Sequence, residues 1–215
     1  MPGRPQESSA WNLPNALTVL RLLLVPVFAW LLLREDGTDA VSQVLAVLVF
    51  IVAMITDYVD GKIARERGLV TSFGKIVDPI ADKALIGTAL IGLSILDRVP
   101  WWVTVVILLR EVGVTLLRFV VIRHGVMPAG RGGKTKTVLQ TVTLVLLMLP
   151  LPDSWSWFTT TLLTATVVVT LATGLDYLAS AITLRRTSER TAGKKAAKAA
   201  RAAESADVTR RTTGP

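Results

Sequence analysis

Residues 57–85 read DYVDGKIARERGLVTSFGKIVDPIADKAL and contain four aspartates in two pairs, at Asp57, Asp60, Asp78 and Asp82. Apolar stretches precede the first pair and follow the second, so the pairs are expected at the end of one helix and the start of the next. Residues three or four positions apart share one face of a helix. Two antiparallel helices joined by this loop can therefore bring all four carboxylates together.

Four clustered carboxylates at membrane depth repel one another and cost free energy to desolvate, so they need a cation to neutralise them. The chain has no cysteine, and no histidine lies in this stretch. Ligation by oxygen alone favours Mg²⁺ or Mn²⁺ over zinc. We therefore predict that Asp57, Asp60, Asp78 and Asp82 are metal ligands, sufficient for two ions, an arrangement that clamps the attacking and leaving oxygens in phosphoryl transfer.

The composition around this stretch indicates a membrane protein. The chain has 215 residues, 51% of them hydrophobic, and its mean hydropathy is +0.52, which excludes an ordinary soluble domain. A membrane-spanning helix needs about 20 mostly apolar residues. Six segments qualify, at residues 16–33, 40–56, 76–96, 101–122, 138–151 and 157–184. We predict an all-α polytopic protein with six transmembrane helices, preceded by a short interfacial segment near Trp11.

The charges between these segments predict the orientation. The loops at 62–75 and 123–136 are basic, whereas the other connections are acidic or nearly neutral. By the positive-inside rule, both basic loops, both termini and the four aspartates lie on the cytoplasmic side of the cell membrane. Arg21 interrupts the first apolar run and no small-residue cleavage pattern closes it, so we expect the N-terminus to be retained.

The chain is expected to divide into an N-terminal tail at 1–11, a transmembrane domain at 12–184 and a disordered cytoplasmic tail at 185–215. The last segment holds nine basic and three acidic residues. Such a tail suits either nucleic acid or anionic lipid headgroups. Because no aromatic residue interleaves the charges to stack on bases, we predict contact with lipid and no nucleic-acid partner.

Small residues and an arginine between the acids fit a nucleotide diphosphate. Gly61, Ala64 and Gly74 leave room near the carboxylates, and Arg65 can bind a phosphate with its planar guanidinium group. Taken singly, the small residues are equally typical of tight helix packing in lipid. Together with the acids, they fill every fixed position of the pattern D-x₂-D-G-x₂-A-R-x₈-G-x₃-D-x₃-D.

This pattern resembles the signature of the CDP-alcohol phosphotransferase family, and the resemblance covers residues 12–184 in length and helix layout. It implies that Asp57, Asp60 and Asp78 bind metal and the CDP pyrophosphate. It also implies that Asp82 helps to bind metal and accepts the proton of the acceptor alcohol. On the same resemblance we expect a homodimer whose active site opens to the cytoplasm and to lipid. The expected CDP-binding residues are Asp57, Asp60, Gly61, Ala64, Arg65, Gly74 and Asp78.

Basic residues elsewhere predict that the acceptor carries a phosphate. Arginine at membrane depth normally has an acidic or phosphate partner, and glycines and lysines before the fifth span suit an anionic headgroup. The alternatives are that Arg110 pairs with Glu111 or another acid, and that the loop merely obeys the positive-inside rule. The predicted acceptor phosphate-binding residues are Arg110, Arg118, Arg131, Lys134 and Lys136.

Four further stretches narrow the resemblance to family members that transfer the phosphatidyl group of CDP-diacylglycerol to sn-glycerol 3-phosphate, giving phosphatidylglycerophosphate and CMP. They are NLPNALTVLRLLLVP at 12–26, FGKIVDPIADKAL at 73–85, PWWVTVVILLREVGVTLLRF at 100–119 and GGKTKT at 132–137. Acceptors that share the chemistry are an inositol phosphate and phosphatidylglycerol. An ion-coupled transporter is the alternative from another class, because intramembrane acids and arginines also mark transporters.

Overall fold

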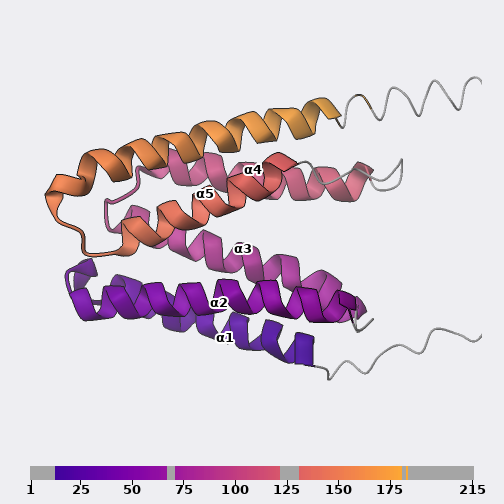
Figure 1. Ribbon diagram of the computed structural model, residues 1–215, viewed down its shortest axis with the longest axis horizontal. Coiled ribbons are helices and arrows are strands. Elements are labelled where there is room, and N and C mark those ends of the chain that lie inside the picture. The colour runs from indigo at the N-terminus through magenta and orange to yellow at the C-terminus, as the bar shows by residue number, and fades with distance from the viewer. Residues whose placement is uncertain (1–12, 67–70, 122–130, 181–182, 184–215) are drawn as a thin grey trace, which may run out of the picture.

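The computed structural model describes residues 13–66, 71–121, 131–180 and 183, and every regular element in them is helical. The elements run roughly antiparallel in one bundle (Figure 1). They are α1 (Leu13–Leu33), a 3-10 helix η1 (Arg34–Gly37), α2 (Ala40–Glu66), α3 (Ser72–Ile95), α4 (Trp101–Val121), α5 (Arg131–Met148), a 3-10 helix η2 (Asp153–Trp155) and a last helix over residues 156–180.

The all-α prediction is confirmed, because every regular element of the described residues is a helix. By length and composition, three described helical segments can cross a membrane, at Pro14–Gly37, Ala40–Ala64 and Asp153–Ser180, and Thr135–Met148 is a shorter apolar helix. The sequences of α3 and α4 include charged residues within their length, which lowers their mean hydropathy. The chain is thus an integral membrane protein by its apolar helices, and its six spans stay a prediction.

Polar or proline residues mark the starts of three helices. The Asp39 carboxylate accepts a hydrogen bond from the Ser42 amide (3.3 Å) and another from the Ser42 hydroxyl (2.5 Å), directly before α2. Thr71 caps α3. Pro100 precedes α4 and its carbonyl accepts from the Val103 amide (2.9 Å). These contacts satisfy amides that the first helical turn leaves without partners.

Two helices extend further into polar sequence than the hydropathy pattern predicts. Helix α2 continues to Glu66 instead of ending near residue 56. Helix α5 begins at Arg131 instead of residue 138, so part of the basic segment expected to be a loop is helical. Hydropathy marks only the apolar part of a helix, whereas backbone hydrogen bonds continue into its polar turns.

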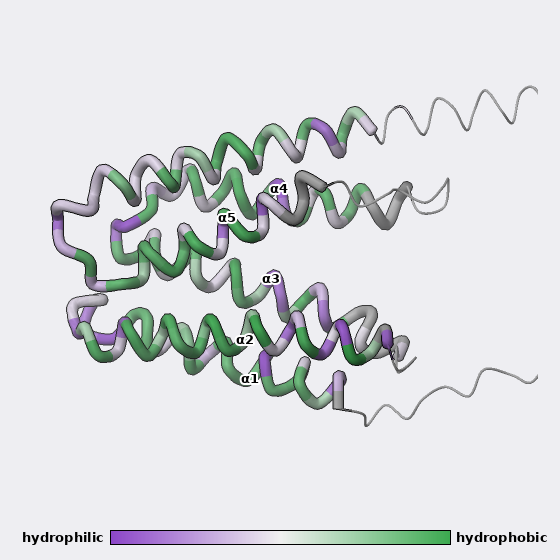
Figure 2. The backbone as a smooth tube through the Cα atoms, viewed as in Figure 1, coloured by the Kyte–Doolittle hydropathy of each residue, from purple (hydrophilic) through white to green (hydrophobic). Residues whose placement is uncertain are grey.

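Side chains of α1, α2 and α3 form one half of the core. The Phe28 and Phe50 rings lie 5.6 Å apart between their centroids, and Leu32, Ala46 and Leu90 are fully buried beside them. Many large apolar side chains remain exposed on the helices, as expected where lipid replaces water around the bundle. In Figure 2, apolar residues fill the middle of these helices and polar ones gather toward one end of α2 and α3.

An arginine joins the helices at the opposite end of the bundle. The Arg98 guanidinium donates to the Gly37 carbonyl (2.7 Å), to Gln43 Oε1 (3.1 Å) and to the Leu147 carbonyl (3.1 Å). Gly37 has a φ of +71°, and a Cβ there would lie 2.8 Å from the Leu96 side chain. Glycine is therefore required for this close turn.

The acid-bearing helix ends share the other end of the bundle with the start of α5. Figure 1 shows that the start of α1, the end of α2, the start of α3, the end of α4, the start of α5 and the end of the last helix all lie there. The connections around residues 34–39, 96–100 and 149–155 lie at the Arg98 end. The four aspartates and the basic first turn of α5 thus belong to the same end of the bundle.

Candidate active site

Helix α1 supplies the contacts that hold three of the four aspartates. Arg21 is 0% exposed, and its guanidinium pairs with the Asp57 carboxylate through Nη1 and with Asp60 Oδ2 through Nη2 (2.5 Å). One turn earlier on α1, the Thr18 hydroxyl donates to Asp78 Oδ1 (2.6 Å). Side chains of α1 therefore contact both acid pairs, in addition to the link that the chain makes between α2 and α3.

The site carries more negative charge than Arg21 neutralises. The negative charges of Asp78 and Asp82 both act on the Asp57 carboxylate, and Asp60 is only 3% exposed. In the described ranges, no three acidic or histidine side chains stand close enough to hold a metal ion as they are. Arg21 lies between the first two carboxylates, as a cation would.

The chemistry of the donors fits a hard divalent ion. All four side chains offer carboxylate oxygens, and the excess negative charge is of the kind that Mg²⁺ or Mn²⁺ balances. A guanidinium held by two carboxylates shows that this position accepts positive charge. The predicted metal ligands are thus brought to one region, and ion binding itself remains a prediction.

A glycine leaves room beside Asp78. The Gly74 amide donates to the Thr71 hydroxyl (3.0 Å), which in turn donates to Asn15 Oδ1 (3.0 Å). A Cβ on Gly74 would lie 3.0 Å from Asn15 Oδ1 and 3.5 Å from Asp78 Oδ2. Any side chain at position 74 would therefore intrude between α1 and the Asp78 carboxylate, which gives the predicted clearance at Gly74 a structural basis.

The other predicted CDP-binding residues lie on the last turns of α2. Gly61 is four residues after Asp57, and Ala64 is four residues after Asp60, so each small residue follows an acid on the same helical face. Arg65 belongs to the same helix, and its side chain is outside the described part of the structure.

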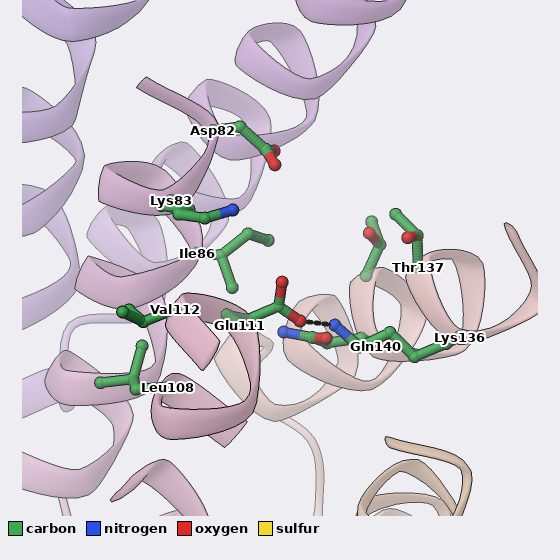
Figure 3. Close-up of a pocket in the computed structure, with 10 residues that line it drawn as sticks. Asp82, Lys83, Ile86, Leu108, Glu111, Val112, Lys136, Thr137 and Gln140 are labelled. Carbon is green, nitrogen blue, oxygen red and sulfur yellow. Dashed lines mark hydrogen bonds and ion pairs between the residues drawn. The ribbon is translucent and has the colours of Figure 1, made fainter. Parts of the chain in front are cut away.

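A pocket opens between α3, α4 and α5 beside Asp82 (Figure 3). Its cavity volume is about 140 Å³. Lys136 is 5% exposed, and its ammonium group pairs with the Glu111 carboxylate on the pocket wall. The lining residues are Asp82, Lys83, Ile86, Leu108, Glu111, Val112, Lys136, Thr137, Gln140 and Thr141.

Arg110 turns away from this pocket toward the last helix. Its Nη2 donates to the Thr173 hydroxyl (3.0 Å), its guanidinium lies 5.8 Å from the centroid of the Tyr177 ring, and its Nη1 lies 3.3 Å from Glu111 Oε1. The pairing with Glu111 that the sequence left open is therefore present. Arg110 and Lys136 thus share the Glu111 carboxylate, which lines the pocket.

The remaining predicted acceptor residues are Arg118 near the end of α4 and Arg131 and Lys134 in the first turn of α5. Their helices place them at the acid-bearing end of the bundle, and their side chains lie outside the described residues. Of the five predicted residues, Lys136 lines the pocket directly.

The structure adds Thr18, Arg21 and Gln140 to the candidate site residues. The signal for Arg21 was its charge within an apolar run, which implies an acidic partner at membrane depth. Gln140 gave a weaker signal, as a polar residue inside an otherwise apolar stretch of α5. The partner of Thr18 is 60 residues away along the chain, and nothing in the local sequence points to it.

A family model described as CDP-alcohol phosphatidyltransferase matches residues 11–173. The chain belongs to this family. The match includes the four aspartates, α1 with Arg21, and the whole pocket beside Asp82. Membership of the CDP-alcohol phosphatidyltransferase family confirms the resemblance inferred from the eight-residue pattern and gives no support to an ion-coupled transporter.

Relatives within the CDP-alcohol phosphatidyltransferase family bear several names. A probable phosphatidylglycerophosphate synthase of Mycobacterium tuberculosis is 51% identical over 171 residues, covering 80% of this chain and 82% of the relative. A CDP-diacylglycerol–glycerol-3-phosphate 3-phosphatidyltransferase of Bacillus subtilis is 41% identical, covering 61% and 74%. A CMP-forming cardiolipin synthase of Streptomyces coelicolor is 37% identical, covering 58% of each chain.

Proposed function

We propose that this chain transfers the phosphatidyl group of CDP-diacylglycerol to sn-glycerol 3-phosphate, giving phosphatidylglycerophosphate and CMP. The observation that carries the proposal is the position of Asp82, whose charge acts on the Asp57 carboxylate and whose side chain also lines the pocket between α3, α4 and α5. A carboxylate in that position can contact both a nucleotide-linked lipid and a small polar acceptor. The names of the relatives at 51% and 41% identity support the same acceptor.

In this reaction the Asp82 carboxylate accepts the proton of the acceptor's primary hydroxyl, whose oxygen attacks the β-phosphorus of CDP-diacylglycerol. A bond forms between that oxygen and the β-phosphorus, the bond to the bridging pyrophosphate oxygen breaks, and CMP leaves. A general base must lie within hydrogen-bonding reach of the hydroxyl, which the pocket beside Asp82 permits.

Asp57, Asp60, Asp78 and Asp82 would hold Mg²⁺ or Mn²⁺, which supplies positive charge to the pyrophosphate when it is bound. Arg21 orients Asp57 and Asp60, and Thr18 orients Asp78. These contacts fix carboxylate positions before substrate arrives, so less ordering is needed during the reaction. Gly61, Ala64, Arg65 and Gly74 are proposed to contact the CDP moiety.

The acceptor phosphate is proposed to bind at the mouth of the pocket, near the end of α4 and the start of α5. Lys136 is already paired with Glu111, so a phosphate there must share this ammonium group with the carboxylate. Further positive charge comes from Arg118, Arg131 and Lys134, with Arg110 acting through Glu111. This placement directs the hydroxyl end of the acceptor toward Asp82.

In the cell membrane we propose six spans, with both termini and the active site on the cytoplasmic side, and a homodimer. The helix ends support the topology, because the start of α1 and the end of the last helix lie at the same end of the bundle as the acid-bearing ends of α2 and α3 (Figure 1). The basic segments flanking these ends favour the cytoplasm. The dimer rests on the family resemblance alone.

The test is a comparison of acceptors with purified protein, CDP-diacylglycerol and Mg²⁺. We expect phosphatidylglycerophosphate from sn-glycerol 3-phosphate, and at least about tenfold lower kcat/KM with inositol phosphate or phosphatidylglycerol. Product identity is read by thin-layer chromatography of the radiolabelled lipid. Equal use of two acceptors, or cardiolipin as the main product, would refute the assignment of glycerol 3-phosphate.

A further inference from the structure

Gln140 is a buried polar side chain without a hydrogen-bond partner. It lies on α5, is 3% exposed and lines the pocket beside Asp82. Neither its Nε2 nor its Oε1 has a partner among the described residues. Most buried polar side-chain atoms in proteins are hydrogen-bonded, and leaving one unpaired lowers stability. A ligand in the pocket would give both atoms of Gln140 a partner.

The neighbours of Gln140 are already engaged. Lys136, one turn earlier on α5, pairs with Glu111 from α4, and this pair neutralises one acid and one base on the wall. Asp82 from α3 faces the same space above this pair (Figure 3). Gln140 is thus a neutral group in the pocket that offers both donor and acceptor capacity and has neither in use.

We propose that Gln140 is a specificity-determining residue that binds the non-reacting hydroxyl of a polyol phosphate acceptor, an inference that rests on the proposed function. A hydroxyl both donates and accepts a hydrogen bond, and a carboxamide offers the complementary acceptor and donors. In sn-glycerol 3-phosphate this hydroxyl is on the carbon next to the attacking one. With the attacking hydroxyl at Asp82, its neighbour lies against the pocket wall that includes Gln140.

Selectivity follows from the cost of an unpaired amide. An acceptor that lacks the middle hydroxyl leaves Gln140 buried and unsatisfied in the occupied pocket, where water no longer reaches it. Sites built to hydrogen-bond a substrate hydroxyl discriminate strongly against analogues without it. The alternative is a structural role, in which bound water satisfies Gln140 and the acceptor never contacts it.

The test compares Gln140→Leu with the wild type on two acceptors, sn-glycerol 3-phosphate and 3-hydroxypropyl phosphate, which lacks the middle hydroxyl. We expect the wild type to favour glycerol 3-phosphate by about 10- to 100-fold in kcat/KM. In Gln140→Leu the preference falls to within about threefold, and the KM for CDP-diacylglycerol is unchanged. The melting temperature stays the same or rises, because an unpaired buried amide has been removed.

Thr143→Val is the matched control. Thr143 is buried on the same helix, its hydroxyl lies 2.7 Å from that of Thr166, and it is not part of the pocket lining. This variant keeps the wild-type preference between the two acceptors. Gln140→Met, which keeps the length of the side chain, replaces Gln140→Leu if the leucine variant does not fold.

Two results overturn the proposal in distinguishable ways. Suppose the wild type uses glycerol 3-phosphate and the Gln140 variants keep its full preference for that acceptor over 3-hydroxypropyl phosphate. Gln140 then does not bind the middle hydroxyl, and the proposed function stands. If the wild type releases CMP only with another acceptor, the proposed function fails and this inference fails with it.

Discussion

Replacing Asp82 by asparagine is expected to lower kcat by about two to four orders of magnitude, the usual contribution of a general base. Asparagine has nearly the same shape but cannot accept the proton of the attacking hydroxyl. The described residues give Asp82 no ion pair, so the substitution leaves no buried partner uncompensated. CMP release from CDP-diacylglycerol in the presence of sn-glycerol 3-phosphate measures the loss.

Asp153→Asn is the matched control for this substitution. Asp153 is exposed in η2, at the opposite end of the bundle. Its replacement removes one carboxylate from the chain without touching the pocket, and activity should stay at the wild-type level. If Asp82→Asn retained more than about a tenth of wild-type kcat, Asp82 would not be the base.

Arg21→Met is expected to lower the free energy of unfolding by about 3–5 kcal/mol, the typical cost of removing one partner of a buried ion pair. The substitution leaves Asp57 and Asp60 without the guanidinium that lies between them. It should also abolish activity, because the two carboxylates then lose their fixed positions. Thermal unfolding in detergent, followed by circular dichroism, measures the stability change.

Added Mg²⁺ extends the Arg21 experiment. If the carboxylates accept a divalent ion, Mg²⁺ raises the melting temperature of Arg21→Met more than that of the wild type, since it binds the folded site and replaces lost positive charge. Arg34→Met is the control: Arg34 is exposed and lies 5.3 Å from the Trp30 ring centroid at the other end of α1. A melting temperature for Arg21→Met equal to that of Arg34→Met would contradict a structural role for the Arg21 pairs.

The spacing of the aspartates along the sequence was enough to predict that each pair lies on one helix. Asp57 and Asp60 lie three apart and Asp78 and Asp82 four apart, and the structure places each pair on one helix, α2 and α3. Hydropathy predicted which segments are helical because apolar runs of this length pack or insert as helices. It did not predict the polar extensions of α2 and α5, because most of their residues are not apolar.

The contacts that organise the site could not be read from the sequence. Arg21 meets Asp57 across 36 residues and Thr18 meets Asp78 across 60. Such pairs depend on how α1 packs against α2 and α3, and a helical period says nothing about which helices are neighbours. For the same reason the sequence could not decide between a phosphate and Glu111 as the partner of Arg110, or reveal that Gln140 lies in a pocket.

Divalent-ion dependence of CMP release is the measurement on which the whole proposal depends. The purified protein is treated with a chelator and given CDP-diacylglycerol and sn-glycerol 3-phosphate, and CMP is measured before and after Mg²⁺ or Mn²⁺ is added back. We predict background release with the chelator and recovery of full activity with either ion. CMP release that is the same with and without the chelator would contradict a metal site formed by Asp57, Asp60, Asp78 and Asp82.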